Sequence, residues 1–192
     1  MEVSSTRSLL KGQAIMEERS GEAFEGDEPF TVIGRKLQPG EAAPDFSLDY
    51  LDLAEMTIRS ACLADSAGMV RLLSAVNSLD MPVCSWQTKR WEELSKMLPA
   101  GICLYTISMD HPHTQARWQA AEQVMHQALS ASRSEQFGQD YGLLLKERRL
   151  LQRATVVINR HDRIVYMEYV DNQLREPDYA TAIAALRQAV TE

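Results

Sequence analysis

Three near-continuous apolar runs constrain the fold of this chain more than any other feature of its sequence. They are Met69 to Val76, Ile102 to Ile107 and Ala154 to Ile158. Runs of this length and character are typical of strands that are buried on both faces, rather than of strands with one face in water. We therefore expect them to form the centre of a sheet that is covered on both sides.

Helices are predicted between and after these strands, over residues 85–98, 112–122 and 177–190. In the first, Trp91, Leu94 and Leu98 recur at helical spacing. A further strand, residues 164–170, follows the third apolar run after a short polar turn, which predicts an antiparallel hairpin. Strands that alternate with helices and close on a hairpin and a helix indicate an α/β, three-layer architecture with a mixed central sheet. This order of elements matches a thioredoxin-like fold.

The N-terminal part is predicted to contribute a β-hairpin and an extension. Residues 30–34 and 44–48 read as two extended stretches on either side of the turn Pro39-Gly40. Residues 1–29 contain 3 basic and 7 acidic residues, so we expect a flexible, solvated acidic extension there. The expected division is an extension over 1–29 and one domain over 30–192.

The composition limits the classes of partner. With 45% hydrophobic and 24% charged residues the chain reads as an ordinary globular domain. Its net charge of -7, its pI near 5.2 and its scattered basic residues argue against nucleic acid as a partner. There is no apolar run near the ~18 residues of a membrane span and no pattern of a secretory signal, so we expect a cytoplasmic protein without membrane contact.

Three cysteines, Cys62, Cys84 and Cys103, are the candidates for chemistry. They lie far apart, without CxxC or zinc-ligand spacing, so neither a disulfide scaffold nor a metal site is predicted. Cys84 falls at the start of the first predicted helix, where the helix dipole and unpaired N–H groups favour a thiolate. From position alone, a reactive thiol and an inert, buried cysteine are equally good interpretations of Cys84.

The other two cysteines have a structural interpretation. Cys103 lies within an apolar strand, where core packing is expected, and Cys62 precedes a loop. Either residue could resolve an oxidised Cys84 only if the fold brought it close. His111-Pro112-His113 lacks the spacing of a metal site and is interpreted as a surface turn.

Five segments in order along the chain carry a resemblance to a known family. They are Pro39-Gly40-Glu41-Ala42-Ala43-Pro44-Asp45-Phe46-Ser47-Leu48, Ser78-Leu79-Asp80-Met81-Pro82-Val83-Cys84, Ile107-Ser108-Met109-Asp110, Arg153-Ala154-Thr155-Val156-Val157-Ile158 and Glu176-Pro177-Asp178-Tyr179. From Phe30 onward, over about 160 of the 192 residues, the chain resembles the bacterial thiol peroxidases, the atypical 2-Cys branch of the peroxiredoxins. The resemblance implies that Cys84 attacks a hydroperoxide and that Arg153 stabilises its thiolate. It further implies that no cofactor or metal is needed and that the protein is a homodimer.

Three positions depart from the family pattern. The family motif Pro-x-x-x-Thr-x-x-Cys reads here Asn77-x-x-x-Met81-x-x-Cys84. Met81 lacks the hydroxyl that would bond the peroxide, and Asn77 is expected to leave its loop less restricted and the thiol less shielded. Gln119 occupies the position of the family's resolving cysteine, so the family's intramolecular disulfide cannot form. Trp86 is expected to narrow the pocket.

These features are consistent with three functions. The first is a one-Cys thiol peroxidase that reduces hydrogen peroxide or alkyl hydroperoxides at Cys84 and is reduced by an external thiol such as thioredoxin, glutaredoxin or a low-molecular-weight thiol. The second is a binding or redox-regulatory protein whose peroxide site is impaired, as Asn77, Met81 and Gln119 suggest. The third, a disulfide exchanger, has less support because no second cysteine lies three residues from Cys84.

Overall fold

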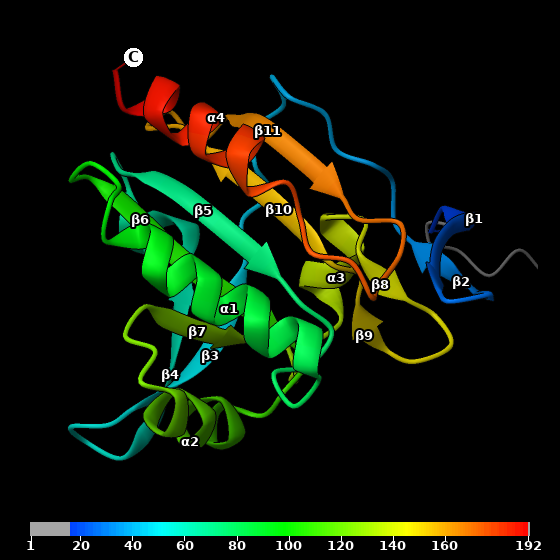
Figure 1. Cartoon of the computed structure of the whole chain (residues 1–192), viewed down its shortest axis with the longest axis horizontal. Coiled ribbons are helices and arrows are strands. Elements are labelled where there is room, and N and C mark those ends of the chain that lie inside the picture. The colour runs from blue at the N-terminus through cyan, green and yellow to red at the C-terminus, as the bar shows by residue number, and fades with distance from the viewer. Residues whose placement is uncertain (1–15, 192) are drawn as a thin grey trace, which may run out of the picture.

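A seven-stranded mixed sheet forms the centre of the molecule (Figure 1). The computed structural model describes residues 16–191, so residues 1–15 of the expected extension lie outside the described part. The sheet order is β11-β10-β5-β6-β7-β3-β4, in which β5, β6 and β7 are parallel and the other neighbours are antiparallel. The strands are β3 (Ser47–Asp52), β4 (Thr57–Cys62), β5 (Val70–Ala75), β6 (Ile102–Ser108), β7 (Gln127–Ser130), β10 (Ala154–Ile158) and β11 (Ile164–Tyr169).

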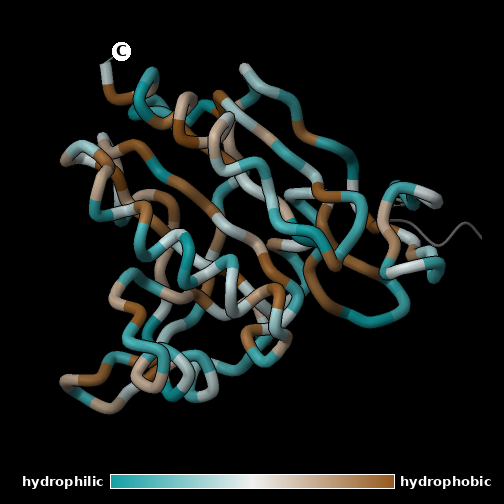
Figure 2. The backbone as a smooth tube through the Cα atoms, in the orientation of Figure 1, coloured by the Kyte–Doolittle hydropathy of each residue, from teal (hydrophilic) through white to brown (hydrophobic). Residues whose placement is uncertain are grey.

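Each of the three apolar runs forms a strand in the middle of this sheet, as predicted. In β5 and β10 every residue is buried. In Figure 2 the apolar segments run through the middle of the molecule, while the loop between β8 and β9 is hydrophilic. β10 and β11 form the expected antiparallel hairpin.

Two layers cover the faces of the sheet. Helices α1 (Pro82–Ser95) and α4 (Tyr179–Thr191) pack on one face, where Trp91 and Leu186 meet Leu72. On the other face, Phe137 of the short α3 (Gln136–Asp140) and the following Tyr141 pack in a cluster with Leu73. Helix α2 (Pro112–Glu122) packs on β3 and β7, and a 3-10 helix, η1 (Leu63–Ser66), follows β4. The three-layer α/β fold is therefore confirmed.

The N-terminal hairpin differs from the prediction. It is formed by β1 (Glu18–Glu25) and β2 (Glu28–Ile33), which continue through β8 (Leu144–Leu145) and β9 (Leu150–Leu151) into a second, four-stranded sheet. Ordered structure therefore starts before Phe30, within the expected extension. The sequence could not indicate β1 because only Arg19 and Ala23 of its eight residues are buried.

The second stretch of the expected hairpin has other partners. Residues around Pro39-Gly40 do not form a hairpin turn, because Gly40 and Ala43 donate backbone hydrogen bonds to Ile164 and Asp162 at the β10–β11 hairpin. β3, which contains only Ser47 and Leu48 of the predicted second stretch, pairs with β4 instead.

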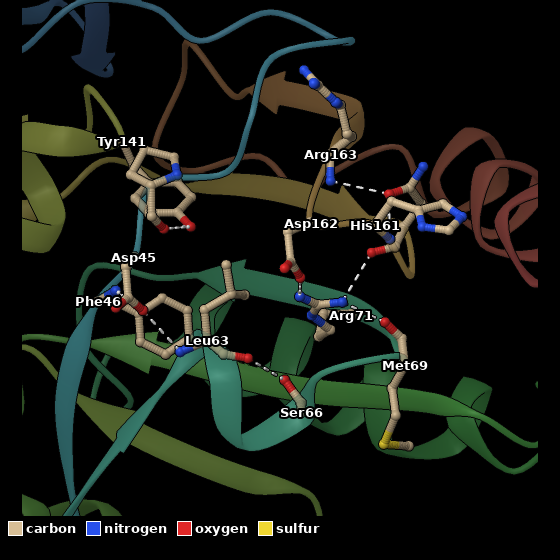
Figure 3. Close-up of polar contacts among 12 residues, drawn as sticks. Asp45, Phe46, Leu63, Ser66, Met69, Arg71, Tyr141, His161, Asp162 and Arg163 are labelled. Atoms are coloured by element: carbon tan, nitrogen blue, oxygen red, sulfur yellow. Dashed lines mark hydrogen bonds and ion pairs between the residues drawn. The ribbon is translucent and has the colours of Figure 1, made fainter.

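A buried arginine fixes the turn of the β10–β11 hairpin (Figure 3). Arg71, near the start of β5, is 0% exposed, and its guanidinium donates to the carbonyls of Met69 and Asn159 and pairs with Asp162. A buried charge of this kind is tolerated because it is paired and hydrogen-bonded. No helix in the described part of the chain is long and apolar enough to cross a membrane.

Candidate active site

Cys84 lies in the first turn of α1, at the carboxyl end of β5. The helix begins at Pro82, three residues earlier than predicted, with Met81 in the extended N-cap conformation. Proline suits this first helical position because its φ is already helical and the missing N–H has no intrahelical partner. The thiol is completely buried, with an exposed fraction of 0%.

Arg153 reaches this thiol from the residue that precedes β10. Its Nη2 lies 3.3 Å from the Cys84 Sγ and 2.9 Å from the carbonyl oxygen of Gln173. Its Nη1 donates to the Oε1 of Gln87, and Gln87 in turn donates to the Ser74 Oγ at 2.8 Å. Gln87 and the Gln173 carbonyl therefore hold the guanidinium, and its Nη2 faces the sulfur. A positive charge at this distance favours the thiolate.

Asn77 is held tightly, contrary to the expected looser loop. It is 3% exposed, and its Nδ2 donates to the Leu151 carbonyl at 2.7 Å and to the Gln173 Oε1 at 3.2 Å. Its Oδ1 lies 3.8 Å from the Cys84 Sγ. The expectation of a less shielded thiol is wrong because these hydrogen bonds restrict the loop where the family has proline.

An apolar cluster covers Cys84. Val76 and Leu79 are buried in it, and Met81 and Trp118 are its partly exposed members. Trp86, which was expected to narrow the pocket, is 59% exposed. The aromatic residue beside the thiol is thus Trp118 of α2. Because the sulfur has no exposed surface, a peroxide reaches it only when a member of this cover moves.

Gln119 and the two other cysteines do not join the site. Gln119 donates to the His126 carbonyl at 2.7 Å. Cys103 is the β6 partner of Arg71 at the start of β5. Val76, which packs beside Cys84, follows Arg71 by about five residues, or roughly 16 Å along the strand. Cys62 ends β4, four strands or roughly 19 Å from β5. A disulfide needs Cα atoms within about 7 Å, so neither thiol resolves Cys84 in this arrangement.

The predicted core role of Cys103 needs a correction. Its side chain is only partly buried, and its Sγ lies 3.2 Å from the Met69 Sδ. His111 and His113 are exposed at the start of α2, as expected of a surface turn. Within residues 16–191, no group of three or more His, Cys, Asp or Glu side chains is placed to hold a metal ion.

Sequence reasoning missed the two glutamines of the site. Gln87 could have been found, because it follows Cys84 by three residues and so lies on the same face of the helix. Gln173 carried no such signal, since it lies in a loop far along the chain. It is 1% exposed and accepts hydrogen bonds from both Arg153 and Asn77.

Comparisons with known proteins agree with this fold and identify its family. The Redoxin family model matches residues 38–183. The chain is 42% identical to a thiol peroxidase of Streptococcus sanguinis over 161 residues, which cover 83% of this chain and 94% of that protein. It is 40% identical to a thiol peroxidase of Halalkalibacterium halodurans over 169 residues, which cover 87% of this chain and 97% of that protein.

Solved structures show the same fold. A peroxiredoxin-like protein from Aquifex aeolicus superposes with a TM-score of 0.79 at 24% identity, covering 91% of this chain and 98% of that one. A thiol peroxidase from Chromobacterium violaceum superposes with a TM-score of 0.74 at 20% identity, covering 88% and 97%. From the family match and the two identities near 40%, the chain belongs to the bacterial thiol peroxidases, a family of peroxiredoxin-type oxidoreductases.

Proposed function

We propose that Cys84 is the peroxide-reducing thiol of this thiol peroxidase and that it works in a one-Cys manner. The observation that carries the proposal is the 3.3 Å contact between the Arg153 Nη2 and the Cys84 Sγ, in a position closed to bulk water. Electrostatic stabilisation is strong in such a position because the local dielectric is low. Arg153 is thus suited to stabilise both the thiolate and the charge that develops on the departing oxygen.

The reaction balances without a cofactor. The Cys84 thiolate attacks the terminal oxygen of a hydroperoxide, the O–O bond breaks, and the alkoxide or hydroxide leaves and takes up a proton. Cys84 becomes a sulfenic acid. An external thiol then condenses with it, releasing water and forming a mixed disulfide, and a second thiol releases Cys84 and leaves as the disulfide of the reductant.

An external reductant follows from the placement of the other sulfur atoms. Gln119 cannot form a disulfide. By strand geometry, Cys103 lies beside a residue that is roughly 16 Å along β5 from Val76, and Cys62 lies on a strand roughly 19 Å from β5. We infer that the reductant is thioredoxin, glutaredoxin or a low-molecular-weight thiol. We also infer a cytoplasmic homodimer from the family resemblance, and sedimentation equilibrium of the full chain tests the dimer.

The proposal is tested by identifying which cysteine the hydroperoxide oxidises. The reduced protein is exposed briefly to a slight excess of hydrogen peroxide, and separately of cumene hydroperoxide, with a sulfenic-acid trap present. Peptide mass analysis is expected to find the adduct on Cys84, with Cys62 and Cys103 as internal controls. Cys84→Ser is expected to abolish peroxide consumption, while Cys62→Ser retains it. Equal, slow oxidation of all three cysteines would contradict the proposal.

A second function is favoured by one observation, the complete burial of Cys84 beneath Met81 and Trp118. A chain that kept the fold but closed the site would act by binding or redox regulation instead of turnover. The same experiment separates the two. Selective oxidation of Cys84 within seconds supports the peroxidase, whereas an unreacted Cys84 in a folded protein supports the regulatory function.

A further inference from the structure

We infer that Asn77 is a positioning residue that holds Cys84 in its thiol form, in opposition to Arg153. This inference rests on the proposed function of Cys84. Asn77 lies in the loop between β5 and α1, and its side chain contacts the sulfur that the guanidinium also contacts. Its contacts leave one orientation for its amide, and that orientation determines what it does to the thiol.

The orientation of the Asn77 amide depends first on that of Gln173. Its Nε2 donates to the carbonyls of Val170 at 2.8 Å and Asp171 at 3.2 Å. Its Oε1 accepts from the backbone N–H of Arg153 at 2.8 Å. If the Gln173 amide were turned over, its Nε2 would face the Arg153 N–H and its Oε1 would face the two carbonyls, and these hydrogen bonds would be lost. The Oε1 therefore has to face Asn77.

Gln173 and Leu151 then orient Asn77. The amide group that meets the Gln173 Oε1 and the Leu151 carbonyl has to be the Nδ2, because both partners are acceptors. The Oδ1 is thereby turned toward Cys84, 3.8 Å from the Sγ. An amide oxygen accepts a hydrogen bond but does not take the proton at neutral pH. It therefore stabilises S–H and repels a thiolate through its dipole.

Arg153 acts in the opposite direction, since its Nη2 donates to the same sulfur at 3.3 Å. The hydrophobic side chains that cluster with Cys84 are those of Val76, Leu79, Met81 and Trp118. Beyond them, Tyr179 of α4 interacts with Arg153, and burial raises the Tyr179 pKa, so it is neutral at working pH. Asp110 binds the loop through Ser78 and the Leu79 N–H. Asn77 and Arg153 both hydrogen-bond the Cys84 sulfur, and they act on its balance between thiol and thiolate in opposite directions.

Two variants of matched shape test this balance through the pH profile of Cys84 oxidation. The background is the full chain with Cys62→Ser and Cys103→Ala, oxidised by hydrogen peroxide in a rapid-quench instrument and analysed by intact mass. Asn77→Leu removes the acceptor and is expected to move the midpoint of the profile to lower pH, raising the rate below the midpoint roughly two- to tenfold. Asn77→Asp retains an acceptor and adds negative charge, so its midpoint does not fall.

A merely structural role of Asn77 gives a different result. Both variants would then change the rate while the midpoint stays that of the background protein, and this result, or an upward shift in Asn77→Leu, overturns the inference. If Cys84 of the background protein is not oxidised at any pH, the proposed peroxidase function fails. That outcome is distinguishable, because the hydrogen bond from Cys84 is also measured without any peroxide.

The second measurement is the infrared S–H stretch of the background protein, in which Cys84 is the remaining cysteine. A hydrogen bond from S–H to the Asn77 Oδ1 lowers the frequency relative to a free thiol in a hydrocarbon solvent. A lowered band that returns to the free value in Asn77→Leu is expected. A band at the free-thiol frequency in the background protein overturns the inference even if the variant does not fold.

Discussion

Met81 and Trp118 are the two partly exposed residues in the cluster that covers Cys84. Met81 stands where the family motif has threonine, so the chain has a thioether in place of a hydroxyl beside the thiol. A thioether is a weak acceptor and cannot donate. At the scale of single residues, the candidate site therefore has a cation, Arg153, beside the thiol, but one polar side chain fewer than the family motif provides.

Restoring the hydroxyl is expected to speed the reaction. Met81→Thr should raise the rate constant of Cys84 oxidation by hydrogen peroxide about ten- to a hundredfold, because a hydrogen bond to the charged centre contributes roughly 1.5–3 kcal/mol in the transition state. Met81→Val, which has nearly the shape of threonine, is the control for the change in size. Equal acceleration in both variants would assign the effect to access rather than to the hydroxyl.

At the scale of elements, a largely buried hydrogen bond between a carboxylate and an imidazole connects α1 to the segment between α2 and β7. The Glu92 Oε2 lies 2.7 Å from the His126 Nδ1 and accepts from the N–H groups of Met125 and His126. The Thr106 Oγ1 lies 2.9 Å from the His126 Nε2. These contacts fit a neutral imidazole that donates from Nδ1 and accepts at Nε2.

This pair should make the protein less stable in acid. Burial lowers the pKa of His126 in spite of Glu92. For Glu92, burial alone would raise the pKa, but the hydrogen bonds of His126 and Met125 leave it lowered. Both groups bind protons more readily when unfolded, so their stabilisation is present above the unfolded pKa values, near 6.5 and 4.3, and is lost as the pH falls.

Urea unfolding at pH 7.5 and pH 5 measures this loss. The wild-type free energy of unfolding is expected to be lower at pH 5. Glu92→Gln should reduce it at pH 7.5 by about 1.5–3 kcal/mol and increase the difference between the two pH values, because His126 loses the partner that raises its pKa. Glu93→Gln, at the exposed neighbouring position, is the matched control and should behave as wild type. An unchanged pH difference in Glu92→Gln would contradict this assignment.

At the scale of the whole molecule, β1 supports the active site from outside the central sheet. The Phe24 N–H donates to the Asp171 carbonyl and the Gln173 N–H donates to the Phe24 carbonyl, each at 2.8 Å. Gln173 in turn accepts from Arg153 and Asn77. A strand in the expected flexible extension thus helps to position the residues that hold Cys84.

Breaking this connection is expected to slow the chemistry. Phe24→Pro removes the N–H that binds Asp171 and should lower the rate constant of Cys84 oxidation several-fold, because the Gln173 segment loses one of its two backbone bonds to β1. Phe24→Ala keeps both backbone bonds and should retain most of the rate. The measurement is the single-turnover rate of Cys84 oxidation in the two variants. Equal rates would mean that β1 does not support the site.

Much of the fold could be predicted from the sequence, because strands buried on both faces are necessarily apolar. β10 covers the predicted residues 154–158, and Cys84 and Arg153 come together as the resemblance implied. β1 could not be predicted, since a polar edge strand lacks an apolar pattern. Neither could the role of Asn77, because that role depends on Gln173, 96 residues further along the chain.

The distances along the chain within this site also determine when it can form during synthesis. The first strand of the supporting hairpin is made early, Cys84 follows, and the partners Arg153 and Gln173 come last. While a ribosome is still adding the residues between them, the thiol lacks its cation, and Asn77 lacks the Gln173 amide that orients it. Domains generally fold as units as the chain emerges. The nascent protein therefore carries an ordinary cysteine until almost the whole chain has been translated.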